Sequence, residues 1–210
     1  MEILYEDAYY NNMIFDLHVH TTHSSCSGLS LAEILRHARL LGLDGVCVTD
    51  HNTLSARNEI SEGVQNDGLC IIFGMEYDTP EGDFLIFGSC DNLKPGMKAR
   101  EMLALVARQG GVAVAAHPCR NDRAVDPSLW KEGLCRIVES INGRNRRQEN
   151  RRIQQIAVRY GLVQCGGSDA HHLSELGKSA THFNYPVRNC QDLVKALQEG
   201  ACHPLSIRKF

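Results

Sequence analysis

Short apolar runs of strand length recur along this chain, and stretches with helical periodicity separate them. We predict strands at residues 14–17, 45–49, 69–73, 84–88, 112–116 and 136–139, near 163, and at 180–183. Helices are predicted at residues 31–41, 98–109, 146–160 and 191–199, with a weaker one at 54–65. Strands that alternate with helices are typical of βαβ units, which build a parallel sheet or a barrel. The pattern therefore predicts an α/β fold with a barrel-like architecture.

The first predicted helix has the clearest end signals. Ser30 is a preferred N-cap residue, and Glu33 stands where a capping box needs an acidic side chain. Gly42 is a typical helix terminator. The apolar positions of this helix are Leu31, Ile34, Leu35, Ala38 and Leu41. This spacing predicts a helix that packs one face against a sheet.

Length and composition restrict the possible functions. The chain has 210 residues, 43% hydrophobic and 22% charged, which predicts one soluble domain covering residues 1–210. A net charge of −3 provides no general attraction to nucleic acid or to an anionic membrane, so a nucleic-acid partner is not favoured. No apolar stretch approaches the roughly 20 residues that span a bilayer. The acidic N-terminus lacks the features of a signal peptide.

The cysteines indicate a reduced protein. There are nine of them, an odd number, and no two are spaced C-x-x-C. Several fall in or beside apolar runs, where a thiol packs as a small hydrophobic group. A disulfide or zinc-finger scaffold is therefore disfavoured, and we expect a cytoplasmic location.

Side chains that bind metals follow five of the apolar runs. Loops at the carboxyl ends of parallel strands converge on one mouth of an α/β fold, so we expect these side chains to meet there. The candidate metal ligands are His18, His20, His51, Glu76, His117, Asp169 and His171. The set predicts a site for two to three divalent metal ions.

The residue types suit this chemistry. His18 and His20 lie on the same side of an extended strand because side chains alternate along it. Imidazole binds Zn²⁺, Mn²⁺ and Fe²⁺, and a carboxylate such as Glu76 can bridge two ions that share a water molecule. Pro118 follows His117 and predicts an extended backbone there.

In sequence and order, five segments resemble the motifs of the PHP family, named for its DNA polymerase and histidinol phosphatase members. The segments are DLHVHT (16–21), VTDHNT (48–53), GMEY (74–77), AHP (116–118) and GGSDAH (166–171). The resemblance extends from about Ile14 to Phe183. It implies a distorted (β/α)₇ barrel, similar to a TIM barrel, with two or three divalent metals at its carboxyl-terminal mouth. It also implies hydrolysis of phosphoesters.

By motif position, the resemblance also implies a division of the ligands. His18, His20, Glu76 and Asp169 would hold one metal. Glu76 would bridge to a second metal bound by His117, and His51 and His171 would serve a third. Asp50 would orient a ligand imidazole. Glu76, Asp169 and His171 are the predicted catalytic residues.

The chain departs from the family pattern at two places. Cys26 stands where many members have an aspartate or histidine ligand, and no histidine lies between Glu76 and His117. The second and third metals are therefore each short of one protein ligand. Water, a substrate phosphate or the Cys26 thiolate can fill the gap, or the third ion can be absent.

Two arginines are candidates for binding a phosphoryl group, because guanidinium presents a planar fork of donors. Arg120 follows His117 by three residues, and a salt bridge is an equal alternative for it. Arg144 follows a predicted strand end, so it can reach the mouth. The arginines at 146, 147, 151 and 152 are interpreted as helix-surface charge.

The leading hypothesis is a metal-dependent phosphoesterase that hydrolyses a small phosphomonoester with a metal-activated hydroxide. A nucleotide, a nucleoside bisphosphate or a compound like histidinol phosphate would suit it. A 3′–5′ exonuclease-type phosphodiesterase, an amidohydrolase-type enzyme and a non-catalytic metal-binding module are the alternatives. Amidohydrolase barrels often bridge their metals with a carboxylated lysine, whereas Glu76 suits that place here.

Overall fold

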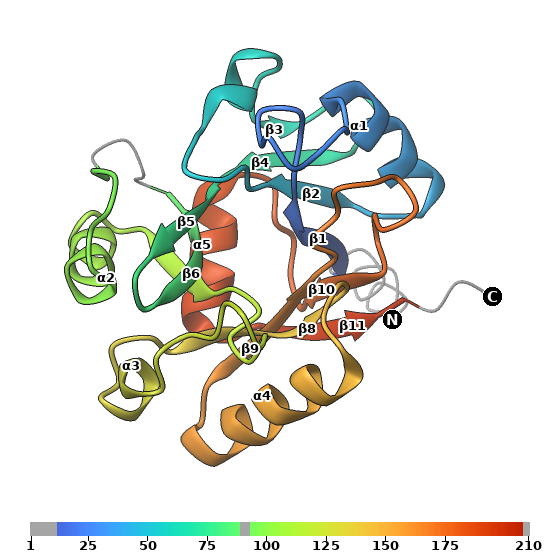
Figure 1. Ribbon diagram of the computed structural model, residues 1–210. Helices are drawn as coiled ribbons and strands as arrows, with labels where there is room; N and C mark the ends of the chain where they lie inside the picture. The colour runs from blue at the N-terminus through green and yellow to red at the C-terminus, as the bar shows by residue number, and fades with distance from the viewer. Residues whose placement is uncertain (1–11, 89–92, 208–210) are drawn as a thin grey trace, which may run out of the picture.

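The computed structural model describes residues 12–88 and 93–207, and there the strands form two sheets. The six-stranded sheet has the order β11 (Cys202–Ser206), β10 (Ser179–Phe183), β1 (Met13–Val19), β2 (Gly45–Val48), β4 (Cys70–Phe73) and β3 (Gly63–Val64). The five-stranded sheet has the order β5 (Met75–Thr79), β6 (Gly82–Phe87), β7 (Val112–Ala115), β8 (Ile137–Asn142) and β9 (Val163–Gly167). Figure 1 shows the two sheets with the helices around them.

The predicted α/β class is confirmed, but a closed barrel of seven β/α units is not. Strands β1, β2 and β4 pair in parallel, and so do β7, β8 and β9. Strand β6 pairs antiparallel with both β5 and β7, and β10 pairs antiparallel with β1 and β11. Antiparallel neighbours cannot arise from a uniform repeat of strand and crossover helix.

The two sheets touch at seams near the carboxyl ends of their strands. Isolated bridges join Val19 to Ala170 and His51 to Glu76. Gly167 makes one approach possible, because a Cβ there would lie 2.5 Å from the Cβ of His18. The seams bring the ends of β1 and β2 beside β5 and the end of β9.

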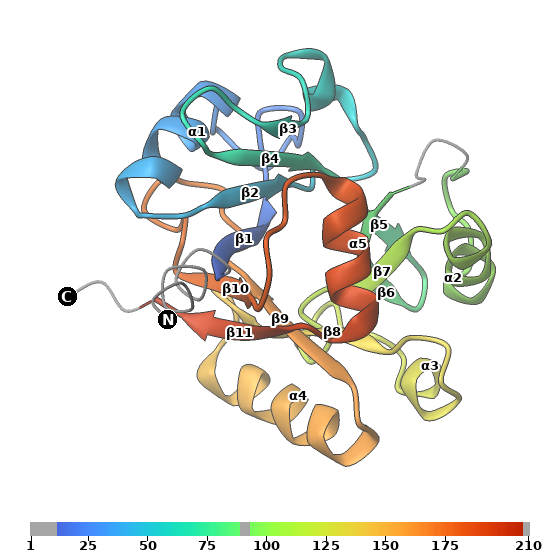
Figure 2. The same ribbon diagram turned by 180° about the vertical axis from the view of Figure 1, so that it is seen from behind.

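The helices cover the outer faces and one end of the fold. They are α1 (Leu31–Leu40), α2 (Ala99–Arg108), α3 (Ser128–Lys131), α4 (Arg147–Tyr160) and α5 (Cys190–Glu199). Helix α1 packs on the six-stranded sheet, whereas α2, α3 and α4 pack on the five-stranded sheet. Helix α5 lies between the sheets, and its apolar side chains join the core that both sheets share (Figure 2). No helix within the described ranges is long and apolar enough to cross a membrane.

Local sequence signals account for most of the elements. Helix α1 has the predicted Ser30 cap and the complete capping box with Glu33. The predicted helix at 54–65 is wrong, because only a 3₁₀ turn, η1 (Ser55–Asn58), and the short β3 form there. Gly63 has a φ of +108°, which breaks a helix. Strands β5 and β11 were not predicted. The acidic residues of β5, MEYDT, obscure its apolar pattern.

Candidate metal centre

Four of the predicted ligands lie in one tight, buried cluster. His18 Nε2 and His20 Nε2 are 3.0 Å apart, and each is 3.2–3.3 Å from Glu76 Oε2. Asp169 Oδ1 is 3.5 Å from both imidazole nitrogens. All four residues are at most 1% exposed. The seam between the sheets therefore brings together the two nitrogens and two oxygens that the sequence predicts as the first ligand set.

The other predicted ligands surround this cluster. His117 Nε2 lies 2.7 Å from Glu76 Oε1, and His51 Nδ1 lies 3.3 Å from Glu76 Oε2. Three groups have ligand atoms within 4.8 Å of one another: His18, His20 and Asp169; His18, Glu76 and His117; and His20, His51 and His171. The last of these groups adds His20 to His51 and His171, the pair predicted for a third ion.

The spacing fits divalent metals. At metal–ligand distances of about 2.0–2.1 Å, the ligands of a tetrahedral zinc site lie roughly 3.3 Å from one another. The nitrogen and oxygen atoms of the first cluster are 3.0–3.5 Å apart. A buried set of imidazoles and carboxylates with this spacing matches the donors that zinc, manganese and iron accept. Whether each residue binds an ion stays a prediction.

Electrostatics keep the carboxylates ionised. Burial alone would raise the pKa of Glu76, but the nearby imidazoles of His18 and His117 hold that pKa well below its usual value. Burial also opposes ionisation of Asp169, and His18 and Arg120 contribute to a net lowering of its pKa. Burial, helped by His20, lowers the pKa of His171 to about 4. These directions favour the carboxylate forms of Glu76 and Asp169 and the neutral imidazole of His171. The neighbouring carboxylates of Glu139, Asp169 and Glu76 instead raise the pKa of His18 against the effect of its burial, so an ion bound there would displace a proton.

Glu139 is a site residue that was not predicted. Its Oε1 accepts a hydrogen bond from His18 Nδ1 at 3.1 Å. Its Oε2 accepts from the backbone N of His117 at 2.8 Å and from Asn142 Nδ2 at 2.9 Å. Because a carboxylate only accepts, His18 must carry its proton on Nδ1, which leaves a lone pair on Nε2 facing the cluster. The signal in the sequence is an acidic residue inside the apolar run Ile137-Val138-Glu139.

Asp50 is connected to the ligand cluster through Ser24, and its orienting role stays a prediction. It accepts hydrogen bonds from the backbone N and the hydroxyl of Thr21 and from Ser24 Oγ. Ser24 Oγ lies 3.2 Å from His20 Nδ1.

Cys26 lies at the rim of the mouth but belongs to none of the three ligand groups. Burial raises the pKa of its thiol, which disfavours the thiolate.

The two predicted arginines occupy different positions. Arg120 donates to Asp169 Oδ2 at 2.6 Å and also to Asn142 and Asn145, so it fulfils the salt-bridge alternative. The side chain of Arg144 is 39% exposed, and its Nη1 lies 2.9 Å from His171 Nδ1. Arg144 is thus the arginine better placed for a ligand that enters the mouth.

The backbone is strained at the site. Among the described residues, the non-glycine residues with positive φ are Asn52 at 54°, His117 at 32° and Asp169 at 57°. The extended conformation expected for His117 is therefore wrong. A turn in which Arg120 N donates to His117 O, together with the bond from His117 N to Glu139, holds it instead. Strain of this kind persists where the surrounding structure enforces it, commonly at functional sites.

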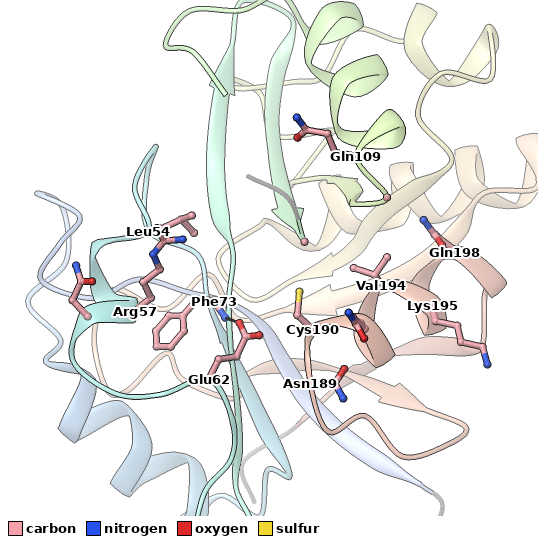
Figure 3. Close-up of a pocket in the computed structure, with 14 residues that line it drawn as sticks. Leu54, Arg57, Glu62, Phe73, Gln109, Asn189, Cys190, Val194, Lys195 and Gln198 are labelled. Carbon is pink, nitrogen blue, oxygen red and sulfur yellow. Dashed lines mark hydrogen bonds between the residues drawn. The ribbon is translucent and has the colours of Figure 1, made fainter. Parts of the chain in front are cut away.

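The cluster opens into a cavity of about 510 Å³. Its lining includes Cys26, His51, Glu76, Arg120, Arg144 and His171, and Arg123, which forms ion pairs with Asp78 and Asp83. A larger cavity of about 940 Å³ lies elsewhere, between η1, the end of β4 and α5 (Figure 3). It holds none of the predicted ligands, so cavity size does not indicate the site here.

Comparison with known proteins agrees with this geometry. The model of PHP-associated domains matches residues 147–202. The matched segment includes α4, β9 and the Asp169–His171 motif. Over these residues the chain is similar to PHP-associated domains, in agreement with the five ligand-bearing motifs.

Two relatives align with parts of this chain. The uncharacterized protein MJ1587 of Methanocaldococcus jannaschii is 30% identical over 113 residues, which cover 49% of the chain and 66% of that protein. The phosphoribosyl 1,2-cyclic phosphate 1,2-diphosphodiesterase of Eggerthella lenta is 38% identical over 85 residues, which cover 40% of the chain and 32% of that enzyme. The alignments thus span less than two thirds of each of these relatives.

Solved structures share the fold over nearly the whole chain. PsfC from Pseudomonas syringae superposes with a TM-score of 0.75 and 21% identity, over 94% of this chain and 92% of that one. A putative metal-dependent phosphoesterase from Bifidobacterium adolescentis superposes with a TM-score of 0.62 and 19% identity, over 89% and 96%. These likenesses establish the fold of this chain.

Proposed function

We propose that this protein is a metal-dependent phosphoesterase and that the buried cluster at its mouth is the active site. The position of Glu76 carries the proposal. One oxygen of this carboxylate contacts His117, and the other contacts His18, His20 and His51. A carboxylate shared in this way is suited to bridge two ions. The relationship to the E. lenta diphosphodiesterase and the fold of the B. adolescentis protein support this class of reaction.

Each group in the mouth has a role in this proposal. Divalent ions, when bound, would polarise a water molecule and neutralise charge on the phosphoryl oxygens. His18, His20, Glu76 and Asp169 would hold one ion. His117 would hold a second with Glu76, and His51 and His171 would bind a third. Arg120 fixes Asp169 through its 2.6 Å ion pair.

Arg144 would bind the substrate. Its guanidinium stands at the mouth beside His171 and is exposed enough to meet an entering phosphoryl oxygen. The cavity of about 510 Å³ suits a phosphomonoester of about nucleotide size, which is the substrate class we propose. All eight described cysteines are free, which agrees with the proposed cytoplasmic location.

Metal analysis combined with a phosphatase screen tests the proposal. Purified protein, reconstituted with Zn²⁺ or Mn²⁺, is expected to hold two to three ions per chain and to hydrolyse small phosphomonoesters. Glu76→Gln should remove at least one ion and nearly all activity. Glu149→Gln, which alters a buried carboxylate outside the mouth, is the matched control. Less than one ion per folded chain would refute the proposal.

A further inference from the structure

A second concave surface lies beside the mouth, on the other side of the loop at residues 142–145. It is a cavity of about 650 Å³ between α4 and the ends of β8, β10 and β11. Its cationic side chains are Arg147, Arg151 and Lys178, and amide side chains from residues 145, 150 and 154 line it as well. We call this surface the α4 groove. No acidic or aromatic residue is among the residues that line it.

The three cations of the α4 groove have no partner within the described residues. Arg147 and Arg151 are four residues apart on α4 and therefore share one face of the helix. Both are exposed, as is Lys178, and no ion pair or side-chain hydrogen bond joins any of the three to another described residue. Like charges so placed destabilise a helix, and a bound anion would relieve that cost.

The nearby acidic residues are engaged elsewhere. Glu149 accepts hydrogen bonds from the backbone N of Asn121 and of Arg146. Glu175 accepts from the backbone N of His171 and of His172. The positive end of the α4 dipole adds to the potential, because α4 begins at Arg147. The groove is therefore cationic although the chain as a whole has a net charge of −3.

The α4 groove and the mouth share one wall. Arg144 lines the mouth, whereas its neighbours Gly143 and Asn145 line the groove. Arg120, on the mouth side, donates hydrogen bonds to Asn142 Oδ1 and Asn145 Oδ1 at 2.9 and 3.0 Å. The mouth and the α4 groove are therefore adjacent, separated by the loop at residues 142–145.

We infer that the α4 groove binds phosphate groups that the substrate carries beyond the scissile one. Unpaired guanidinium and ammonium groups with amide donors recognise phosphate oxygens. Without aromatic side chains the groove offers no stacking surface, so it would contact phosphates and not bases. The ligand is either a small compound with a second phosphate or a single-stranded oligonucleotide. The inference rests on the proposed function for the position of the scissile group.

Binding without catalysis tests the groove independently of the proposed activity. The probe is a fluorescent oligothymidylate, titrated by anisotropy in the presence of a chelator at several salt concentrations. Each phosphate of a single strand that a cation neutralises contributes about 0.7 to the slope of log affinity against log salt. The triple variant R147Q/R151Q/K178Q should therefore lower this slope by about 2 and weaken binding at least about tenfold at low salt. Glutamine is a good helix former, so α4 should persist.

Arg159→Gln is the matched control, because Arg159 is an exposed arginine of the same helix that does not line the α4 groove. Steady-state assays of the metal-loaded protein then identify the source of the phosphates. A KM raised for a nucleoside bisphosphate in the triple variant supports a small ligand, and a KM raised only for oligonucleotides supports a strand. A triple variant that matches Arg159→Gln in slope, affinity and KM would overturn the inference. If the unsubstituted, metal-loaded protein hydrolyses no phosphomonoester, the proposed function is refuted instead.

Discussion

Replacing Glu139 by glutamine should disable His18 as a metal ligand without changing the shape of the site. The amide oxygen of the new side chain would face the two donors, His117 N and Asn142 Nδ2, that Oε2 accepts from now. Its NH₂ group would then point at His18 Nδ1, which could no longer donate. The imidazole proton would move to Nε2, the atom that faces the other ligands.

The expected size of the effect follows from this tautomer change. Loss of an outer hydrogen-bond partner of a ligand typically costs about 10- to 100-fold in metal affinity or activity. This corresponds to about 1.4–2.7 kcal/mol of binding free energy. We expect the upper part of the range, because Glu139 is fully buried and water cannot replace the lost charge.

Competition titration with a chromogenic chelator measures the effect. Glu139→Gln should bind Zn²⁺ about 10- to 100-fold more weakly while its circular dichroism stays that of the unsubstituted protein. The control, Glu149→Gln, removes charge from a buried carboxylate that accepts from backbone N–H groups outside the ligand cluster. Equal zinc affinity in Glu139→Gln and the control would show that Glu139 does not set the His18 tautomer.

Four further predictions concern residues in or beside the mouth. Arg144→Gln should lower kcat/KM about 10- to 100-fold, mainly through KM in steady-state assays, with unchanged metal content. Arg120→Gln should instead reduce metal content in elemental analysis, because Arg120 holds Asp169. Cys26→Ser should change neither metal content nor rate, since Cys26 belongs to no ligand group. Gly167→Ala should cost about 3 kcal/mol in urea unfolding, because its methyl group would collide with β1.

Each of these has an outcome that would contradict it. An unchanged KM in Arg144→Gln would show that Arg144 does not bind the substrate. Full metal content in Arg120→Gln would show that the ion pair with Asp169 does not support metal binding. A lower metal content in Cys26→Ser would restore the thiolate as a ligand. For Gly167→Ala, the control is Gly28→Ala, where an added Cβ meets nothing within 4 Å. Equal free energies of unfolding for Gly167→Ala and Gly28→Ala would refute the close approach of Gly167 to β1.

The sequence alone determined most local elements and indicated the candidate ligands. Ser30, Glu33 and the apolar spacing specify α1 through short-range hydrogen bonds and periodicity, which need no tertiary information. The candidate ligands were visible because polar side chains directly after apolar runs are unusual and recur in a fixed order. The helix prediction for residues 54–65 failed because the apolar periodicity there is weak. Hydrogen bonds in this segment are also made to a strand outside it: Phe73 N of β4 donates to Glu62.

Only the tertiary structure decided how these residues combine. The His18–Glu139 contact joins residues 121 positions apart, and Arg120 reaches Asp169 across 49 positions. Periodicity describes neighbours within one element, whereas such contacts depend on how the two sheets meet. The same holds for the positive φ of His117, where hydrogen bonds from elsewhere in the fold override the preference set by Pro118. The residue types determine the chemistry of the candidate ligands, whereas the contact between the two sheets determines their geometry.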